Sequence, residues 1–435
     1  MLGMKSPFMN LNRAAHGLFF EVIARGTSHS SGVRTASNFG IDIEHRRGTM
    51  KKESRRKFIK ESVTSAASLL ALSALAKTSV TAHEPVVRSR KDTEMSQKPR
   101  LRFAVIGINH DHIHGQIGAT IRGGGEFVSF YAKEPELAAA FAKRYPQIKQ
   151  ARSQEEILED NSIQLVLSAG IPADRAPLGI AVMQHGKDYM SDKPGITSLA
   201  QLAEVRRVQK ATKRIYSIMY SERFENKATV RAGELIKAGA IGNVLQTTGL
   251  GPHRINPKTR PQWFFDRKYF GGIICDIASH QFDQFLYFTG STEASVVASQ
   301  VGNLHHPQWP LFEDFGDVML RGDGGMGYIR VDWFTPDGLS TWGDGRLTII
   351  GTDGFIEVRK NCDVGRSTSG NHLFLTDQKE TRYFDCNSDE LPYGRQLIDD
   401  VLNRTETAMP QAHCFRAMEL ALKAQQQAQT ISLKK

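Results

Sequence analysis

Strands and helices alternate along residues 101–220, and this alternation limits the fold more than any other feature of the sequence. Leu101–Ile106 is predicted as a buried strand, and Gly107 follows it directly, ahead of a helix expected at 113–121. Strands that alternate with helices in this way form a parallel, doubly wound sheet, so the fold class is α/β. The further strands are expected at 127–131, 164–169, 187–190 and 215–220, and the further helices at 135–144, 154–159, 173–185 and 199–212.

The turn after the first expected strand is typical of dinucleotide binding. A glycine at position 107 allows the tight bend, and the N-terminus of the next helix then faces a pyrophosphate. The usual fingerprint has a second glycine where Asn109 stands and a small residue where His112 stands. We predict that Gly107, Asn109, His110 and His112 line a cofactor site whose turn departs from the usual pattern.

The end of the second expected strand bears on the choice of cofactor. No acid stands at that end to hold the ribose hydroxyls, although Glu134 lies close. Lys133 would favour the 2′-phosphate of NADP, whereas a single surface lysine is more often simply solvated. The residues therefore predict NAD or NADP, with Lys133 as a further candidate cofactor contact.

Three histidines follow the glycine turn and resemble a metal-binding cluster: His110, His112 and His114. Their place at the first strand-to-helix turn favours contacts with the phosphates or ribose of a nucleotide instead. We therefore predict no metal. The four cysteines lack zinc-finger spacing as well, and a disulfide between Cys362 and Cys386 is left open.

The positive charge of the chain is concentrated near its start. Residues 1–82 hold 13 Lys and Arg against 5 Asp and Glu, whereas residues 83–435 hold 43 against 41. A nearly neutral body offers no extended basic surface for phosphate backbones, so no nucleic-acid partner is expected.

The basic start is similar to a twin-arginine export signal. Arg55 and Arg56 are followed by a modest apolar run of small residues at 63–76. We predict a signal peptide at 50–82, a flexible linker at 83–100, and an over-extended gene start at 1–49. The twin-arginine machinery would then be a partner, and the protein would be periplasmic or on the outer cell surface.

Two segments carry the residue types that acid–base chemistry needs. Ser191-Asp192-Lys193-Pro194-Gly195 follows the strand expected at 187–190, at the edge where open α/β sheets bind ligands. The segment 271–283, as one helix, would place Asp276, His280 and Asp283 on one face. A carboxylate and an imidazole at the mouth of a cleft can bind and deprotonate a hydroxyl.

These motifs make the chain resemble the glucose–fructose oxidoreductase/inositol dehydrogenase family, Gfo/Idh/MocA. The family's Glu-Lys-Pro motif corresponds to Asp192-Lys193-Pro194. Its Gly-Gly-x-x-x-Asp-x-Gly-x-His-x-x-Asp motif corresponds to 271–283, with Ala278 in place of a glycine. The Ser-Glu-Arg-Phe run at 221–224 is similar to the family's Arg-Phe junction, and 347–354 to its late Gly-Thr-x-Gly hairpin.

The resemblance implies two domains. An N-terminal NAD(P)-binding Rossmann domain is expected at 101–220, and a C-terminal α+β domain for substrate binding and oligomerisation at 221–435. The second domain is expected to hold a large, mostly antiparallel sheet. The sequence agrees, with turn-bounded strand candidates at 244–249, 296–301, 314–320, 326–334, 346–350, 355–360, 372–376 and 381–385, and a last helix at 414–427.

The resemblance also implies the roles of individual residues. His280 is expected to take the hydroxyl proton as a general base, while Lys193 donates to the same oxygen and contacts the cofactor. Asp276 is expected to fix the neighbouring hydroxyl. Arg223 and His253 are further candidates for substrate contact.

The predicted function is that of an NAD(P)-dependent oxidoreductase, which moves a hydride between nicotinamide and a hydroxyl or keto carbon of a sugar or polyol. The alternatives are an NAD-dependent glycosidase that uses transient oxidation and a non-catalytic sugar-binding protein. Because free dinucleotide is scarce outside the cytoplasm, an exported enzyme is expected to hold its cofactor tightly. We also expect a homodimer or homotetramer.

Overall fold

The computed structural model of the protein describes residues 99–433. The expected export signal at 50–82, the segment before it and nearly all of the linker at 83–100 lie outside the described residues. Within the described part of the chain, no helix combines the length and the apolar character needed to cross a membrane.

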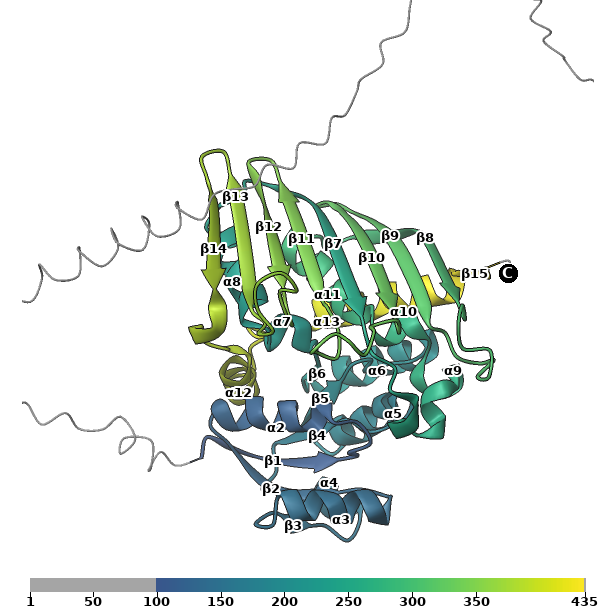
Figure 1. The fold of residues 1–435 in the computed structure, drawn as a ribbon. Coiled ribbons are helices and arrows are strands. Elements are labelled where there is room, and N and C mark those ends of the chain that lie inside the picture. The colour runs from purple at the N-terminus through teal and green to yellow at the C-terminus, as the bar shows by residue number, and fades with distance from the viewer. Residues whose placement is uncertain (1–98, 434–435) are drawn as a thin grey trace, which may run out of the picture. The chain divides into compact units, whose positions relative to one another are not determined.

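The N-terminal half contains a six-stranded parallel sheet in the order β3-β2-β1-β4-β5-β6 (Figure 1). The chain reverses its direction of winding between β1 and β4, which makes their carboxyl ends the switch point where such sheets bind nucleotides. β4 and β6 are buried along their whole length, as expected of strands covered on both faces. The bounds are β1 (Leu101–Ile106), β2 (Gly125–Tyr131), β3 (Lys149–Gln150), β4 (Leu165–Ser168), β5 (Asp188–Asp192) and β6 (Tyr216–Met219).

Helices connect these strands, and local signals in the sequence set where several of them begin. The Ser198 side chain accepts the backbone N–H of Gln201 and so caps α6. α3 and α5 have a proline in the first turn, where a missing N–H costs no helical hydrogen bond. The bounds are α2 (His112–Arg122), α3 (Pro135–Arg144), α4 (Gln154–Glu159), α5 (Pro172–Gln184) and α6 (Leu199–Thr212).

The C-terminal half contains a nine-stranded mixed sheet in the order β14-β13-β12-β11-β7-β10-β9-β8-β15 (Figure 1). Most neighbouring strands are antiparallel, whereas β7 with β10 and β8 with β15 are parallel. All eight expected strands are confirmed, and β15 adds a ninth. The bounds are β7 (Val244–Pro252), β8 (Ala294–Gly302), β9 (Phe315–Gly322), β10 (Met326–Asp332), β11 (Arg346–Gly351), β12 (Gly354–Arg359), β13 (His372–Asp377), β14 (Thr381–Asp385) and β15 (Gln429–Ile431).

Helices cover one face of this large sheet. α8 packs on β12, α11 on β7 and α13 on β8, and the strands bury alternate residues toward them. α12 and α13 also contact the first sheet: the Tyr216 backbone N–H donates to Gln411, and the hydroxyls of Ser217 and Tyr393 are 2.8 Å apart. The bounds are α7 (Ser221–Phe224), α8 (Lys227–Lys237), α9 (Arg267–Phe270), α10 (Ile273–Asp276), α11 (Ser279–Thr289), α12 (Tyr393–Asn403) and α13 (Gln411–Gln427).

Segment 271–283 is not the single helix that the sequence predicted. α10 ends at Asp276 and α11 begins at Ser279, so the two carboxylates of the motif do not share a face. Asp283 is buried and accepts two hydrogen bonds from Arg223, at 2.6 and 2.7 Å, while Asp276 binds a different cation. The one-helix prediction was wrong because each carboxylate is bound by a cation from a distant part of the chain, Arg223 for Asp283 and Lys193 for Asp276. The residue spacing within the segment does not show these partners.

The structure also shows whether the four cysteines form disulfides. All four are free and buried, and no disulfide joins Cys362 to Cys386. Cys386 lies in a separate small core beneath β11, β12 and β13, whereas Cys362 is close to the Thr341 hydroxyl. The thiols therefore act as buried apolar residues.

Candidate active site

A cleft lies at the carboxyl edge of the first sheet, beside the β1–β4 switch point. Gly107 adopts a positive φ of 81° there, and a Cβ on it would lie 3.0 Å from the Gly170 Cα and 3.2 Å from the Ser168 hydroxyl. Only glycine fits this turn without moving backbone atoms. The cleft encloses about 240 Å³ and is lined by Ile106, Gly107, Asn109, Tyr131, Lys133, Glu134, Gln154, Ser168, Gly170, Ile171, Asp174, Pro177 and Leu178.

Residues of the second strand-to-helix connection face the same cleft. The Asn109 amide donates to the Glu134 carboxylate over 2.9 Å, so the residue that replaces the second glycine holds an acid in place. Lys133 lines the cleft next to it. The site thus has an acid for ribose hydroxyls and a cation for a 2′-phosphate, and its residues fit a dinucleotide of either kind.

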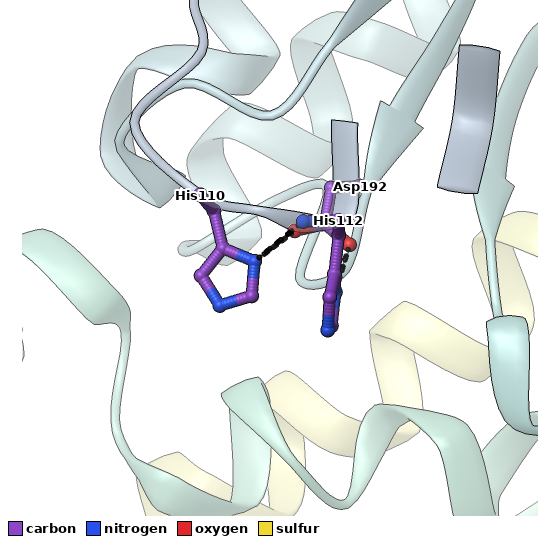
Figure 2. Close-up of side chains that lie close together, drawn as sticks. All are labelled: His110, His112 and Asp192. Atoms are coloured by element: carbon purple, nitrogen blue, oxygen red, sulfur yellow. Dashed lines mark hydrogen bonds and ion pairs between the residues drawn. The ribbon is translucent and has the colours of Figure 1, made fainter. Parts of the chain in front are cut away.

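His110 and His112 lie beside the end of β5, outside the residues that line this cleft. The Nδ1 atom of His112 is 3.0 Å from one carboxylate oxygen of Asp192, and Nδ1 of His110 is 3.5 Å from the other (Figure 2). Burial, together with the neighbouring His112, keeps the pKa of His110 well below its usual value. His114 is separate, with Nδ1 2.9 Å from the Tyr145 hydroxyl.

Arg175 fixes the Asp192-Lys193-Pro194 segment, a role that no sequence pattern indicated. This fully buried side chain donates to the backbone oxygens of Gly170, Lys193 and Pro194. One of its nitrogens is also 3.0 Å from Asp192. Since a buried guanidinium needs a carboxylate and several acceptors, it ties the motif to α5 and holds the Lys193 backbone in one position.

Lys193 and Asp276 connect the two halves of the protein. The Lys193 ammonium donates to an Asp276 oxygen over 3.0 Å, and the two side chains are only 5% and 11% exposed. Lys193 follows β5 of the first sheet, while Asp276 ends α10 of the second half. The structure therefore brings the two motifs together, as the family resemblance implied.

His280 is the second residue of α11 and is almost completely buried. Burial lowers its pKa to about 3; nearby Glu222 opposes this shift, and nearby Lys193 adds to it. Its Nδ1 atom is buried without a hydrogen-bond partner. At neutral pH the imidazole is therefore uncharged, which is the protonation state that can accept a proton.

Two family models match the chain. Residues 101–220 match an oxidoreductase family with an NAD-binding Rossmann fold, and residues 229–357 match the GFO/IDH/MocA C-terminal domain. Together these matches cover more than half of the chain. The chain belongs to the Gfo/Idh/MocA family. Its first domain is thus an NAD-binding Rossmann domain, and Gly107 stands at the first strand-to-helix turn and lines the cleft at the switch point.

Individual proteins agree with this assignment. A solved structure of an inferred oxidoreductase from Erwinia carotovora atroseptica SCRI1043 is 45% identical, with a TM-score of 0.74, and the match covers 76% of this chain and 99% of the other. A levoglucosan dehydrogenase of Pseudarthrobacter phenanthrenivorans is 28% identical over 46% of this chain and 51% of its own length. A scyllo-inositol 2-dehydrogenase (NADP(+)) of Bacillus subtilis is 23% identical over 34% of this chain and 41% of its own. The chain spans about half the length or less of the curated relatives it matches.

Arg223, which the sequence suggested as a substrate contact, has a different environment in this Gfo/Idh/MocA protein. Its guanidinium is bound by the Asp283 carboxylate and lies over the rings of Phe224 and Tyr287. Asp283 also contacts His413 of α13 at 2.8 Å. These contacts account for Arg223 within the core, and they give no support to a substrate contact.

A buried ion pair beside His280 was missed by the sequence analysis. The Lys360 ammonium donates to Glu222 and to Gln284, and Gln281 donates to the same Glu222 oxygen over 2.8 Å. Burial raises the pKa of Glu222, but the Lys360 ammonium outweighs it and lowers the value to about 2. The ionised Glu222 therefore supplies a fixed negative charge next to the candidate base.

His253 follows β7 and is near the same charges. Its ring lies between Trp333 and Trp342, with centroid distances of 5.3 and 4.5 Å. Burial and nearby Lys193 lower its pKa to about 4. The charges of Lys193 and Asp276 both act on the pKa of His253, so this expected substrate contact shares the electrostatic environment of the candidate catalytic residues.

Proposed function

We propose that the protein is an NAD(P)-dependent oxidoreductase that acts on a hydroxyl or keto carbon of a sugar or polyol. The observation that carries this proposal is the Lys193–Asp276 ion pair at 3.0 Å, with the neutral His280 next to it. A buried amine, carboxylate and imidazole together offer donors and acceptors to two adjacent hydroxyls. The relatives named for levoglucosan and scyllo-inositol support a cyclic polyhydroxylated substrate.

Each residue has a distinct task in this proposal. His280 accepts the proton of the reacting hydroxyl, and Lys193 donates a hydrogen bond to the same oxygen as negative charge develops on it. Asp276 accepts a hydrogen bond from the neighbouring hydroxyl and keeps Lys193 in place. When bound, the nicotinamide supplies the hydride acceptor or donor.

The test begins with the small molecules released from natively purified protein, which mass spectrometry would identify as NAD or NADP. A panel of sugars and polyols is then assayed as substrates, and the formation of reduced nicotinamide is followed by its absorbance. We expect His280→Asn and Lys193→Met to lower kcat by roughly 10²–10⁴-fold, and the exposed Lys237→Met to leave it unchanged. Full activity in either active-site variant, with circular dichroism showing native folds, contradicts the proposal.

Two other outcomes of the same assays correspond to the alternative functions. Release of a reducing sugar without net change in reduced nicotinamide would indicate a glycosidase that uses transient oxidation. Sugar binding with no bound dinucleotide and no turnover would indicate a non-catalytic binding protein. The intact Lys193–Asp276 pair and the glycine turn favour a dinucleotide-dependent enzyme over a non-catalytic binding protein.

We also propose that the protein is exported by the twin-arginine pathway with its cofactor already tightly bound. This rests on Arg55 and Arg56 and the apolar run after them. Replacing both arginines by lysine should leave the protein in the cytoplasm, as fractionation would show. Equal export of both forms would contradict it, and a native protein that releases no nicotinamide on denaturation would contradict tight binding.

We propose that two copies pair through the uncovered face of the large sheet. Met326, Gln246, Ile350 and Phe355 form one row across β10, β7, β11 and β12, and the three apolar members are 40–50% exposed. Such a row is typical of an interaction surface. Light scattering should give a dimer or tetramer, and Ile350→Glu should give a monomer; a monomeric wild-type protein would contradict the pairing.

A further inference from the structure

Three possible metal ligands converge where β5 ends and the first turn begins. The rings of His110 and His112 both turn toward the carboxylate of Asp192 (Figure 2). One ligand atom from each of the three residues can be chosen so that all lie within 4.8 Å of one another. From the sequence, the place of the histidines at the first strand-to-helix turn favoured nucleotide contacts over a metal. The fold adds the Asp192 carboxylate, which lies 80 residues beyond His112.

The cluster brings two imidazole nitrogens to one carboxylate. Nδ1 of His112 donates to Asp192 Oδ1 over 3.0 Å, and a metal ion would replace that shared proton. Nδ1 of His110 accepts the backbone N–H of His112 over 3.3 Å, so this ring nitrogen carries no proton, and a metal ion would take the place of this long hydrogen bond. The same nitrogen faces the Asp192 Oδ2 atom at 3.5 Å, and that oxygen is buried without a hydrogen-bond partner. Arg175 lies 3.0 Å from the same oxygen and balances its charge, but it forms no hydrogen bond with it. A cation between the nitrogen and the oxygen would satisfy both.

The spacing of these atoms matches a coordination shell. With metal–ligand distances of about 2.1 Å, the ligand atoms of a tetrahedral zinc site lie roughly 3.4 Å apart. Nδ1 of His112 is 3.0 Å from Asp192 Oδ1 and Nδ1 of His110 is 3.5 Å from Oδ2, and one ligand atom from each of the three residues lies within 4.8 Å of the others. Two imidazoles and one carboxylate suit Zn²⁺ and neighbouring transition metals better than Mg²⁺ or Ca²⁺, which prefer oxygen ligands.

We propose that His110, His112 and Asp192 bind one divalent transition-metal ion, best matched by Zn²⁺, with a coordination position left open. The carboxylate that would hold the ion also accepts the Lys193 backbone N–H over 2.7 Å. The ion would therefore lie at the sheet edge that carries Lys193, where an oxygen of a bound small molecule can occupy the open position. The proposal stands on these three side chains and does not depend on the proposed oxidoreductase activity.

The experiment uses purified full-length protein stripped of metal by a chelator. Zn²⁺ is titrated by calorimetry, and Co²⁺ is added as a spectroscopic probe, because its visible absorption reports coordination by nitrogen and oxygen. We expect one Zn²⁺ per chain and a visible Co²⁺ spectrum. His110→Ala and His112→Ala should each weaken Zn²⁺ binding by at least about tenfold and remove the Co²⁺ spectrum.

His114→Ala is the matched control, because this third histidine of the run contacts the Tyr145 hydroxyl instead of Asp192. It should bind both metals as the wild type does. His112→Gln, at a half-exposed ring, serves as a second variant if an alanine variant fails to fold. Absence of Zn²⁺ binding in the wild type, unchanged binding in the folded His112 variant, or an equal loss in His114→Ala would each overturn the proposal.

Discussion

The replacement of Gly107 by alanine tests the turn on which the cofactor site is built. Gly107 has a φ of 81°, and Gly239, in the turn between α8 and β7, has a φ of 80°. A Cβ on Gly239 would meet nothing within 4 Å, whereas one on Gly107 would lie 3.0 Å from the Gly170 Cα. An alanine would therefore meet the same unfavourable φ at both positions, but only at position 107 would its Cβ also lie against neighbouring atoms.

The magnitudes follow from this difference. Placing alanine at a positive φ costs about 1–2 kcal/mol, which is the whole effect expected for Gly239→Ala. Gly107→Ala adds an overlap with backbone atoms that cannot rotate away, at about 1–3 kcal/mol, so its total is about 2–5 kcal/mol. The displaced turn should also weaken dinucleotide binding, which Gly239→Ala should leave unchanged.

Urea unfolding gives the free energy of unfolding of each variant, and titration with NAD and NADP gives the affinity. The informative quantity is the difference between the two alanine variants, because the backbone strain cancels in it. Equal destabilisation by both variants would refute the argument that close approach to Gly170 demands glycine at position 107. Unchanged dinucleotide affinity in Gly107→Ala would refute the placement of the cofactor beside that turn.

Three further predictions concern stability. Arg223→Leu should lower the free energy of unfolding by about 3–5 kcal/mol, because it leaves Asp283 buried without its cation. Arg231→Leu, at an exposed pair, should lower it by under about 1 kcal/mol, and equal losses in urea unfolding would contradict this prediction. The pKa of His253 is about 4 in the folded protein and ordinarily 6.5, so as pH falls the unfolded chain binds the proton first. The free energy of unfolding should therefore fall as pH drops from 6.5 to about 4. His253→Gln should make this pH dependence weaker, and an unchanged pH dependence would count against burial of the ring. NAD or NADP at about a hundred times its Kd should raise the free energy of unfolding by about 2.7 kcal/mol, and no shift in thermal unfolding would argue against an open cofactor site.

Much of the fold was determined by local sequence. The β1 strand and the helices α3, α4 and α6 match the predicted ranges residue for residue, because apolar periodicity, prolines in first turns and serine caps act within a few residues. All eight expected strands of the second sheet were found because short runs bounded by turn residues are also a local signal. The two-residue β3 and the terminal β15 were missed, since their pairing depends on a neighbouring strand rather than on their own pattern.

Only the tertiary structure decided which distant side chains meet. Lys193 and Asp276 are 83 residues apart, and Asp192 and His112 are 80 apart, so their contacts depend on which strand ends are neighbours. Arg175 likewise depends on packing, because its buried guanidinium pairs with Asp192 in the segment 192–194 whose backbone it holds. Local sequence patterns determine helices and strands through short-range hydrogen bonds and burial. A site instead forms where opposite charges are buried together, and the packing of the elements decides which charges meet.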